Sequence, residues 1–264
     1  MISKLLILLL IFNFGLISLS CKALSGLTRK SGTVFTVEIE PDEPHRREII
    51  EQAMRITESK LNSIKADGEV ARVPGKDNQI SVKIYDSNNT AALKKFLFTS
   101  YRLELKKVVS PPYPAPVQTY PTEQAAVPVA AGDREVLSYP DSEDSAFSQF
   151  VTVENKSVIN GEDVSDAEAF SRSGSKNDYA IYFTLNPKGA AKLSDWTSKN
   201  INNYIAVILN KEVKSIAFIK SQISDNGEIA GRFTEEEAEN IALSLKSGYL
   251  PATMKIIEEK TFQN

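Results

Sequence analysis

A proline-rich segment in the middle of the chain most constrains how it can fold. Six of the twelve prolines, and only one charged residue, Glu123, lie between Ser110 and Gly132. Proline fixes φ and lacks an amide donor, so this segment cannot continue a helix or a central strand, and it favours extended polyproline conformations. We predict a linker over residues 110–134 with a folded part on each side. A recognition loop for a partner is the alternative interpretation.

The part before this segment alternates strand and helix patterns. β-branched residues alternate with others over residues 33–40, which is typical of a half-buried strand. Ile50, Ala53 and Leu61 recur at helical spacing after Asp42, a residue type that caps helices. Further strands are predicted over residues 69–73, 79–85 and 101–108, and a short helix over residues 88–97. This order of strands and helices is that of a ferredoxin-like unit.

The part after the proline-rich segment mixes strands and helices. Strands are predicted over residues 150–158 and 178–185, a short helix over residues 163–170, and a hairpin from residues 204–209 and 213–219. Asn186 followed by Pro187 is typical of a helix N-terminus, because asparagine caps the first turn and proline needs no donor there. The whole chain is therefore predicted to be α+β.

The last helix and strand carry the clearest local signals. Thr234 and Glu237 have the spacing of a capping box. Gly248 suits the turn that ends a helix, and a closing strand is predicted from Met254. Apolar residues between these two ends recur at helical spacing: Ala238, Ile241, Ala242 and Leu245. This pattern predicts a surface helix with one packed face, followed by an edge strand.

The start of the chain has the features of a targeting segment. Lys4 precedes a short apolar run over residues 5–17, and the only cysteine, Cys21, follows. We predict a signal peptide over residues 1–20 and a tether over residues 21–31, with Cys21 as the lipidation site of a bacterial lipoprotein. An uncleaved N-terminal anchor and secretion without an anchor are the alternatives. Each alternative places the folded part outside the cytoplasm.

Composition argues against catalysis and against nucleic-acid binding. The net charge is −3, from 31 basic and 34 acidic residues, and no basic cluster stands out. His45 is the single histidine, and with one cysteine there is little material for a metal site or a catalytic triad. The acidic run at residues 235–237 fits the charge preference of a helix N-terminus better than paired acid–base catalysis. We therefore expect no enzyme, no cofactor, no catalytic residue and no metal ligand.

Five short motifs follow one another along the chain: GLTRKSG at 26–32, FTLNPKGA at 183–190, IAVILNK at 205–211, GRFT at 231–234 and SGYLPA at 247–252. Together they resemble the large extracytoplasmic domain of SecD, an accessory subunit of the bacterial protein-export channel. The first motif is similar to that of the family at Gly26, Leu27, Lys30 and Gly32, and it departs from it at Thr28 and Ser31. The order and separations of the motifs make the resemblance more specific than any single motif.

The resemblance implies a ferredoxin-like base subdomain with an inserted α+β head subdomain. The implied boundaries are 32–109 and 233–264 for the two parts of the base and 135–232 for the head. It further implies a membrane-anchored, periplasmic-side accessory factor of Sec-dependent translocation. Its expected partners are emerging unfolded preprotein and either Sec translocon subunits or a separate SecF-like membrane subunit. A structural lipoprotein with a SecD-like fold and no export role is the alternative.

Overall fold

The computed structural model describes residues 31–263 apart from four internal segments and one single position. The gaps are residues 41–44, 87–89, 141–148, 176–177 and 251. The predicted signal peptide, most of the tether, Cys21 and the predicted cap Asp42 therefore lie outside the described residues. No helix within the described ranges is long and apolar enough to cross a membrane.

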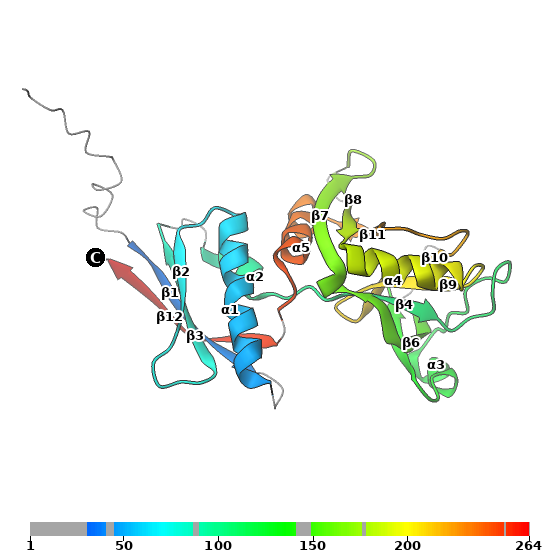
Figure 1. Cartoon of the computed structure of the whole chain (residues 1–264), viewed down its shortest axis with the longest axis horizontal. Coiled ribbons are helices and arrows are strands. Elements are labelled where there is room, and N and C mark those ends of the chain that lie inside the picture. Colours follow the sequence, from blue (N-terminus) through cyan, green and yellow to red (C-terminus); the bar gives the residue numbers. More distant parts are fainter. Residues whose placement is uncertain are drawn as a thin grey trace, which may run out of the picture.

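Both ends of the described chain meet in one four-stranded sheet, which we call the four-stranded unit together with its two helices (Figure 1). The sheet order is β12-β1-β3-β2, and all neighbouring strands are antiparallel. Its elements are β1 (Ser31–Glu40), α1 (Arg46–Ser63), β2 (Gly68–Arg72), β3 (Gln79–Tyr85), α2 (Thr90–Phe98) and β12 (Thr253–Gln263). Alternate residues of β1 and β3, such as Phe35 and Val82, are buried under the apolar faces of α1 and α2.

The fourth strand of this sheet is not the one predicted from the sequence. The predicted strand at residues 101–108 exists as β4 (Leu103–Val108), but it pairs with β6 and β9 in a different sheet. β12 takes its place beside β1, with partners such as Val34 and Lys260. The sequence pattern identified the strand at residues 101–108 correctly, but it placed that strand in the wrong sheet. The pairing of strands that are far apart in the sequence leaves no local signal.

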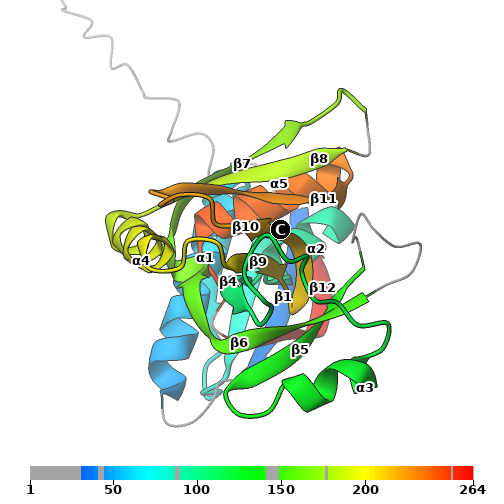
Figure 2. The same cartoon turned by 90° about the vertical axis from the view of Figure 1, so that its right-hand side faces the viewer.

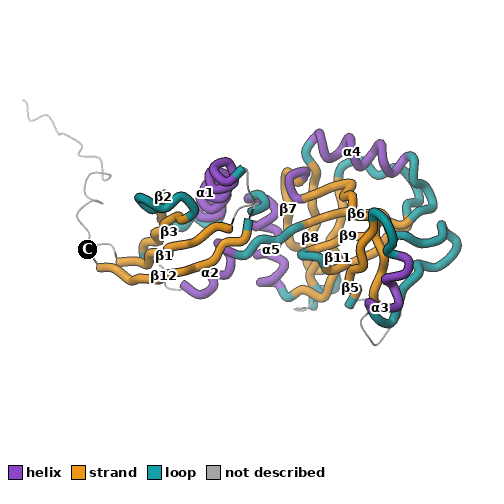
Figure 3. Tube along the Cα trace, turned by 90° about the horizontal axis from the view of Figure 1, so that it is seen from below, coloured by secondary structure: helices purple, strands orange, loops and turns teal. Residues whose placement is uncertain are grey.

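A closed barrel forms the centre of the other half of the molecule. Its strand order is β10-β5-β6-β4-β9. The strands are β4, β5 (Arg134–Tyr139), β6 (Gln149–Asn160), β9 (Tyr204–Leu209) and β10 (Glu212–Phe218). β9 is buried along its whole length. The side chains of one face belong to the barrel core, and those of the other face belong to the core shared with the three-stranded sheet described next. Figure 3 shows these strands beside the four-stranded unit along the long axis of the molecule.

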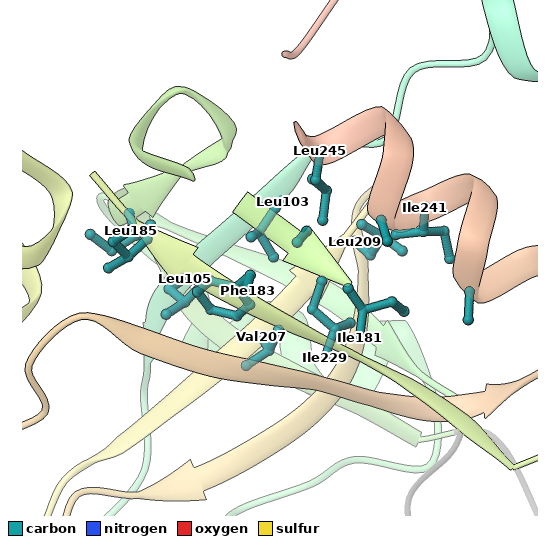
Figure 4. Packing of buried hydrophobic residues seen from close by; sticks show 14 of the residues in the cluster. Leu103, Leu105, Ile181, Phe183, Leu185, Val207, Leu209, Ile229, Ile241 and Leu245 are labelled. Atoms are coloured by element: carbon teal, nitrogen blue, oxygen red, sulfur yellow. The ribbon is translucent and has the colours of Figure 1, made fainter. Parts of the chain in front are cut away.

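A three-stranded sheet and two helices cover the barrel, and we call this whole half the barrel unit. The sheet order is β11-β8-β7. The elements are β7 (Val164–Ser171), β8 (Tyr179–Leu185), α4 (Pro187–Ser198), β11 (Asn226–Phe233) and α5 (Glu235–Ser247). Their side chains pack with those of β4 and β9 in the largest core, which includes Phe183, Val207 and Ile241 (Figure 4).

The predicted helix at residues 163–170 is wrong, because this segment is the strand β7. Alternating Asp, Ala and Glu residues have moderate helix propensity, but β7 pairs antiparallel with β8 from Val164↔Leu185 to Ser171↔Tyr179. α5 packs across the same strand. Tertiary pairing thus overrides a weak local preference, and only a single 3₁₀ turn, Gly161–Asp163, precedes the strand.

The predicted caps of α4 and α5 are confirmed. Asn186 Oδ1 accepts from the Gly189 amide at 2.9 Å. Thr234 Oγ1 accepts from the Glu237 amide at 3.3 Å, while Glu237 accepts from the Thr234 amide at 3.0 Å. Gly248 ends α5 with a φ of +105°, a region that favours glycine. These ends fix α5 on the side of the barrel unit that meets the four-stranded unit, where it packs on β7 and also on α1.

The proline-rich segment lies against the barrel. Tyr204 donates its hydroxyl to the Ala115 carbonyl at 2.5 Å, and the ring of Tyr113 stacks on Phe218 with 4.6 Å between centroids. Tyr120 forms an isolated bridge with Phe150 of β6. The segment also contains a short helix, α3 (Glu123–Ala126), and the 3₁₀ turn Val127–Val129. These contacts hold its first half as one wall of the groove described next.

Candidate functional site

A groove of about 580 Å³ lies between the barrel and the three-stranded sheet. One wall is the stretch Lys214–Ile216 of β10, and the facing wall is Ala230–Arg232 of β11. Pro116 and Val117 of the proline-rich segment close one side. Figure 2 looks onto this side of the molecule, where β10 and β11 lie next to each other.

Both walls are strands whose pairing is incomplete on the groove side. β11 is an edge strand, because its sheet runs β11-β8-β7. β10 pairs with β9 along most of its length, but with β5 only through the register pair Glu212↔Ser138. Strand edges of this kind present backbone donors and acceptors to an added strand. The groove therefore offers backbone hydrogen-bonding positions to an extended chain.

The β11 wall contains an irregularity that displaces its backbone. The regular register with β8 stops at Ile229↔Ile181 and resumes at Phe233↔Tyr179. At Gly231 a Cβ atom would lie 2.5 Å from the ring of Phe233, so a side chain here would force that ring to move. Bulges are over-represented at sheet edges and next to functional sites, where they redirect a side chain or end the strand pairing.

The apolar part of the groove rests on the barrel core. Val117, Tyr139 and Ile216 line the groove and pack against the buried core of the barrel. Because these side chains are held from behind, this surface is formed before any ligand binds. Tyr113 and Ala115 hold the adjoining proline-rich wall through the contacts to Phe218 and Tyr204.

Basic side chains outnumber acidic ones along the groove. Arg172, Lys214 and Arg232 line it, with Asp178 as the only carboxylate among its lining residues. Arg172 lies 3.6 Å from a carboxylate oxygen of Glu228, and both side chains are more than two-fifths exposed. An exposed pair at that distance is weak, so a ligand carboxylate can compete for the guanidinium.

Lys214 is more firmly held than the two arginines. Its ammonium pairs with Glu212 on the same strand and lies 5.6 Å from the ring centre of Phe233. Its side chain is 16% exposed. Arg232 is exposed, and within the described part of the chain no ion pair involves it. Arg172 and Arg232 are therefore the basic groups most accessible to a ligand.

A buried lysine lies away from the groove, in the four-stranded unit. Lys60 of α1 is fully buried, and its Nζ donates to the carbonyl oxygens of Phe96 at 3.0 Å, Leu97 at 3.5 Å and Thr99 at 2.7 Å. The Phe96 and Leu97 carbonyls belong to the last turn of α2, and Thr99 follows that helix directly. Carbonyls at a helix C-terminus have no amide donors within the helix. Burial lowers the pKa of Lys60 to about 7. The arrangement is a structural cap rather than a ligand site.

The residues considered for chemistry in the sequence are not gathered into a site. His45 is exposed at the N-terminus of α1. Glu237 is held by Thr234 in the capping box, and the hydrogen bond from the Thr234 amide lowers the pKa of its carboxyl. Among the described residues no group of three metal-ligating side chains is close enough to hold an ion. Cys21, the predicted lipidation site, lies outside the described residues.

The groove residues were not singled out from the sequence. Arg172 follows β7, Lys214 lies on β10 and Arg232 on β11, so only the fold brings them together. The strand β11 was itself missed, although GRFT at 231–234 was one of the family motifs. Basic residues at the ends of strands, spaced far apart, carry no local pattern that would predict a shared groove.

The fold and its groove define a class of α+β domains that combine a small sheet unit with a larger barrel unit. Residues 134–252 match the family model "SecDF, P1 head subdomain". Among curated proteins the chain is similar to protein translocase subunit SecD of Koribacter versatilis, at 31% identity over 214 residues, covering 80% of this chain and 38% of the relative. SecD of Aquifex aeolicus is 29% identical over 215 residues, covering 81% of this chain and 40% of the relative.

Two solved structures share the fold. SecDF in its super-membrane-facing form covers 89% of this chain and 30% of that chain, with a TM-score of 0.66 at 22% identity. A structure described as a membrane component SecDF that enhances protein export covers 85% of this chain and 98% of that chain, with a TM-score of 0.62 at 23% identity. Likeness at these identities concerns the fold alone.

Together the family model, the SecD relatives and the SecDF neighbours support a SecD P1 domain. The resemblance predicted from the sequence motifs is thus confirmed, and so is the mixed α and β fold. The chain spans about two-fifths of the length of the SecD relatives named above. The division into base and head with the boundaries given above stays a prediction.

Proposed function

We propose that this protein is an extracytoplasmic accessory factor of Sec-dependent protein translocation, and that the groove between β10 and β11 binds emerging unfolded polypeptide. The observation that carries the proposal is the pair of incompletely paired strand edges facing one another across a preformed groove. An extended chain adds to such an edge through main-chain hydrogen bonds, which every sequence can make. A translocation factor needs this tolerance because exported chains differ in sequence.

The pathway is supported by the relatives. The curated relatives are named protein translocase subunit SecD, and one structural neighbour is described as enhancing protein export. We propose that this chain acts beside Sec translocon subunits or a SecF-like membrane subunit on the periplasmic side. The proposed anchor is a lipid on Cys21, or alternatively the N-terminal apolar segment itself. No catalytic step is part of this proposal.

Site-specific photo-crosslinking tests the binding site. A photoreactive amino acid replaces Ser215 on the β10 wall in the full chain, and a matched variant carries it at Ser81 on the outer face of β3. Both serines are half-buried on strands, so their crosslinking efficiency should be comparable in the absence of a ligand. Membranes carrying an exported precursor arrested in transit provide the polypeptide.

We expect an adduct between the Ser215 variant and the precursor and a much weaker one from the Ser81 variant. Equal yields from both positions, or no precursor adduct at either, would contradict binding in the groove. Adducts with neither the precursor nor any Sec subunit would instead favour a structural lipoprotein with no export role.

A further inference from the structure

The two accessible guanidinium groups of the groove give it a charge preference. Arg172 and Arg232 come from the end of β7 and from β11, and both line the groove beside the open strand edges. Arginine presents a planar fork of donors that matches a carboxylate, and it stays charged at any physiological pH. We propose that the groove selects extended polypeptide segments that carry acidic side chains, and this inference rests on the proposed function.

The side-chain spacing of a bound strand suits such a selection. Successive side chains of a strand point to opposite faces, so an added strand would direct alternate side chains toward the barrel and toward solvent. Main-chain hydrogen bonds to β10 or β11 are sequence-independent, whereas the side-chain positions reach different neighbours. A carboxylate near Arg232 would meet a guanidinium that has no ion pair within the described part of the chain.

Arg172 offers a second set of hydrogen-bond donors to a ligand carboxylate. Its present partner, Glu228, lies at 3.6 Å and is itself exposed, so exchange for a ligand carboxylate releases Glu228 to water at small cost. Basic ligand side chains would meet repulsion from the same groups, with Asp178 alone among the lining residues to attract them. The preference is therefore for acidic over neutral segments, and for neutral over basic ones.

Three fluorescent peptides test this preference with the purified full chain. They share one length and one unstructured background, and they carry Asp, Asn or Lys at the same two positions. The Asp and Asn peptides have nearly the same shape, so their comparison isolates charge. Fluorescence anisotropy is measured at low and high salt for the wild type, Arg172→Gln, Arg232→Gln and the control Lys199→Gln. Lys199 is exposed and pairs with Asp195 on the helix α4, outside the groove.

We expect the Asp peptide to bind about fivefold more tightly than the Asn peptide at low salt, with less difference at high salt. Each groove substitution should lower this ratio by about twofold and leave binding of the Asn peptide nearly unchanged, while Lys199→Gln should behave as wild type. Equal affinities for the Asp and Asn peptides in the wild type would overturn the proposal. So would a ratio that survives in both arginine variants.

A blocking variant separates failure of this inference from failure of the proposed function. Ser215→Trp, with Thr119→Trp as a second variant should the first not fold by circular dichroism, fills the groove from either wall. Loss of Asn-peptide binding in the blocked protein, with no Asp preference in the wild type, overturns only the charge preference. Undiminished Asn-peptide binding in the blocked protein overturns both the groove site and its charge preference.

Discussion

Replacing Lys60 with methionine should remove most of the pH dependence of stability of the four-stranded unit between about pH 7 and pH 9. Lys60 is fully buried, and no carboxylate is among its hydrogen-bond partners, which are the carbonyls of Phe96, Leu97 and Thr99. Burial lowers its pKa from 10.5 to about 7 in the folded protein. Methionine has similar length and no titratable group, so it fills the same space and contributes no pH dependence.

The direction of this pH dependence follows from proton binding in the folded and unfolded states. Between the folded value of about 7 and the ordinary value of 10.5, the unfolded chain binds more protons than the folded protein. Stability therefore rises with pH in this window, and it is lower below pH 7, where the charged ammonium must be buried. At about 1.4 kcal/mol per pH unit, the rise from pH 7 to pH 9 is on the order of 2 kcal/mol, because Lys60 is still about half-charged in the folded protein at pH 7 and the slope is smaller there.

Urea unfolding at several pH values measures this difference. A change of about 2 kcal/mol shifts the midpoint by roughly 1 M urea for a protein of this size. Circular dichroism follows both units, whereas fluorescence follows the barrel unit, because Trp196 of α4 is the only tryptophan. The fluorescence transition should therefore be insensitive to Lys60. The control is Lys199→Met, which removes a lysine that is 67% exposed.

The urea midpoint followed by circular dichroism should rise with pH in the wild type and in Lys199→Met, and it should stay nearly flat in Lys60→Met. The same pH slope in Lys60→Met and in the wild type would refute this expectation. A slope that Lys60→Met also removes from the fluorescence transition would mean that the two units unfold together.

Three further predictions concern single side chains. Thr234→Ala removes the capping hydrogen bonds of α5 and should lower the free energy of unfolding by about 1 kcal/mol, measured by urea titration, while Thr234→Ser should restore most of it. Burial alone would raise the pKa of Glu104, but the hydrogen bond from Ser157 at 2.7 Å and the charge of Lys106 outweigh it and lower that pKa. The stability that Glu104 contributes is present above its ordinary pKa of 4.5 and is lost as pH falls through the lower folded value. Glu104→Gln should therefore reduce the fall in the free energy of unfolding at acid pH, measured by urea titration. An unchanged fall in the variant would contradict this. Cys21→Ser should abolish incorporation of a labelled fatty acid if this cysteine is acylated, and retained label in the variant would rule Cys21 out.

Elements whose signals lie within a few residues were predicted correctly. The caps at Asn186 and Thr234 act over three residues, so their sequence patterns determine them almost completely. The segment at residues 163–170 failed because its helix propensity is weak, and pairing with β8 decides its conformation. The partner of β1 failed for a different reason. β12 lies more than two hundred residues away, and an equally good strand pattern, β4, lies nearer.

The groove could not be predicted for the same physical reason. Its walls come from β10, β11, the proline-rich segment and the end of β7, which become neighbours only in the folded chain. Which edges are open depends on sheet order, and sheet order is set by contacts between distant residues.

Amide hydrogen exchange with and without a bound unfolded polypeptide tests the central claim most directly. The full chain is mixed with a reduced, unfolded exported protein, and exchange is followed for peptides covering each strand. We predict slower exchange in the stretches Lys214–Ile216 and Ala230–Arg232, which face the groove, and unchanged exchange in β2 and β3 of the four-stranded unit. Protection confined to other strands, or no protection under conditions where complex formation is seen, would contradict binding in the groove.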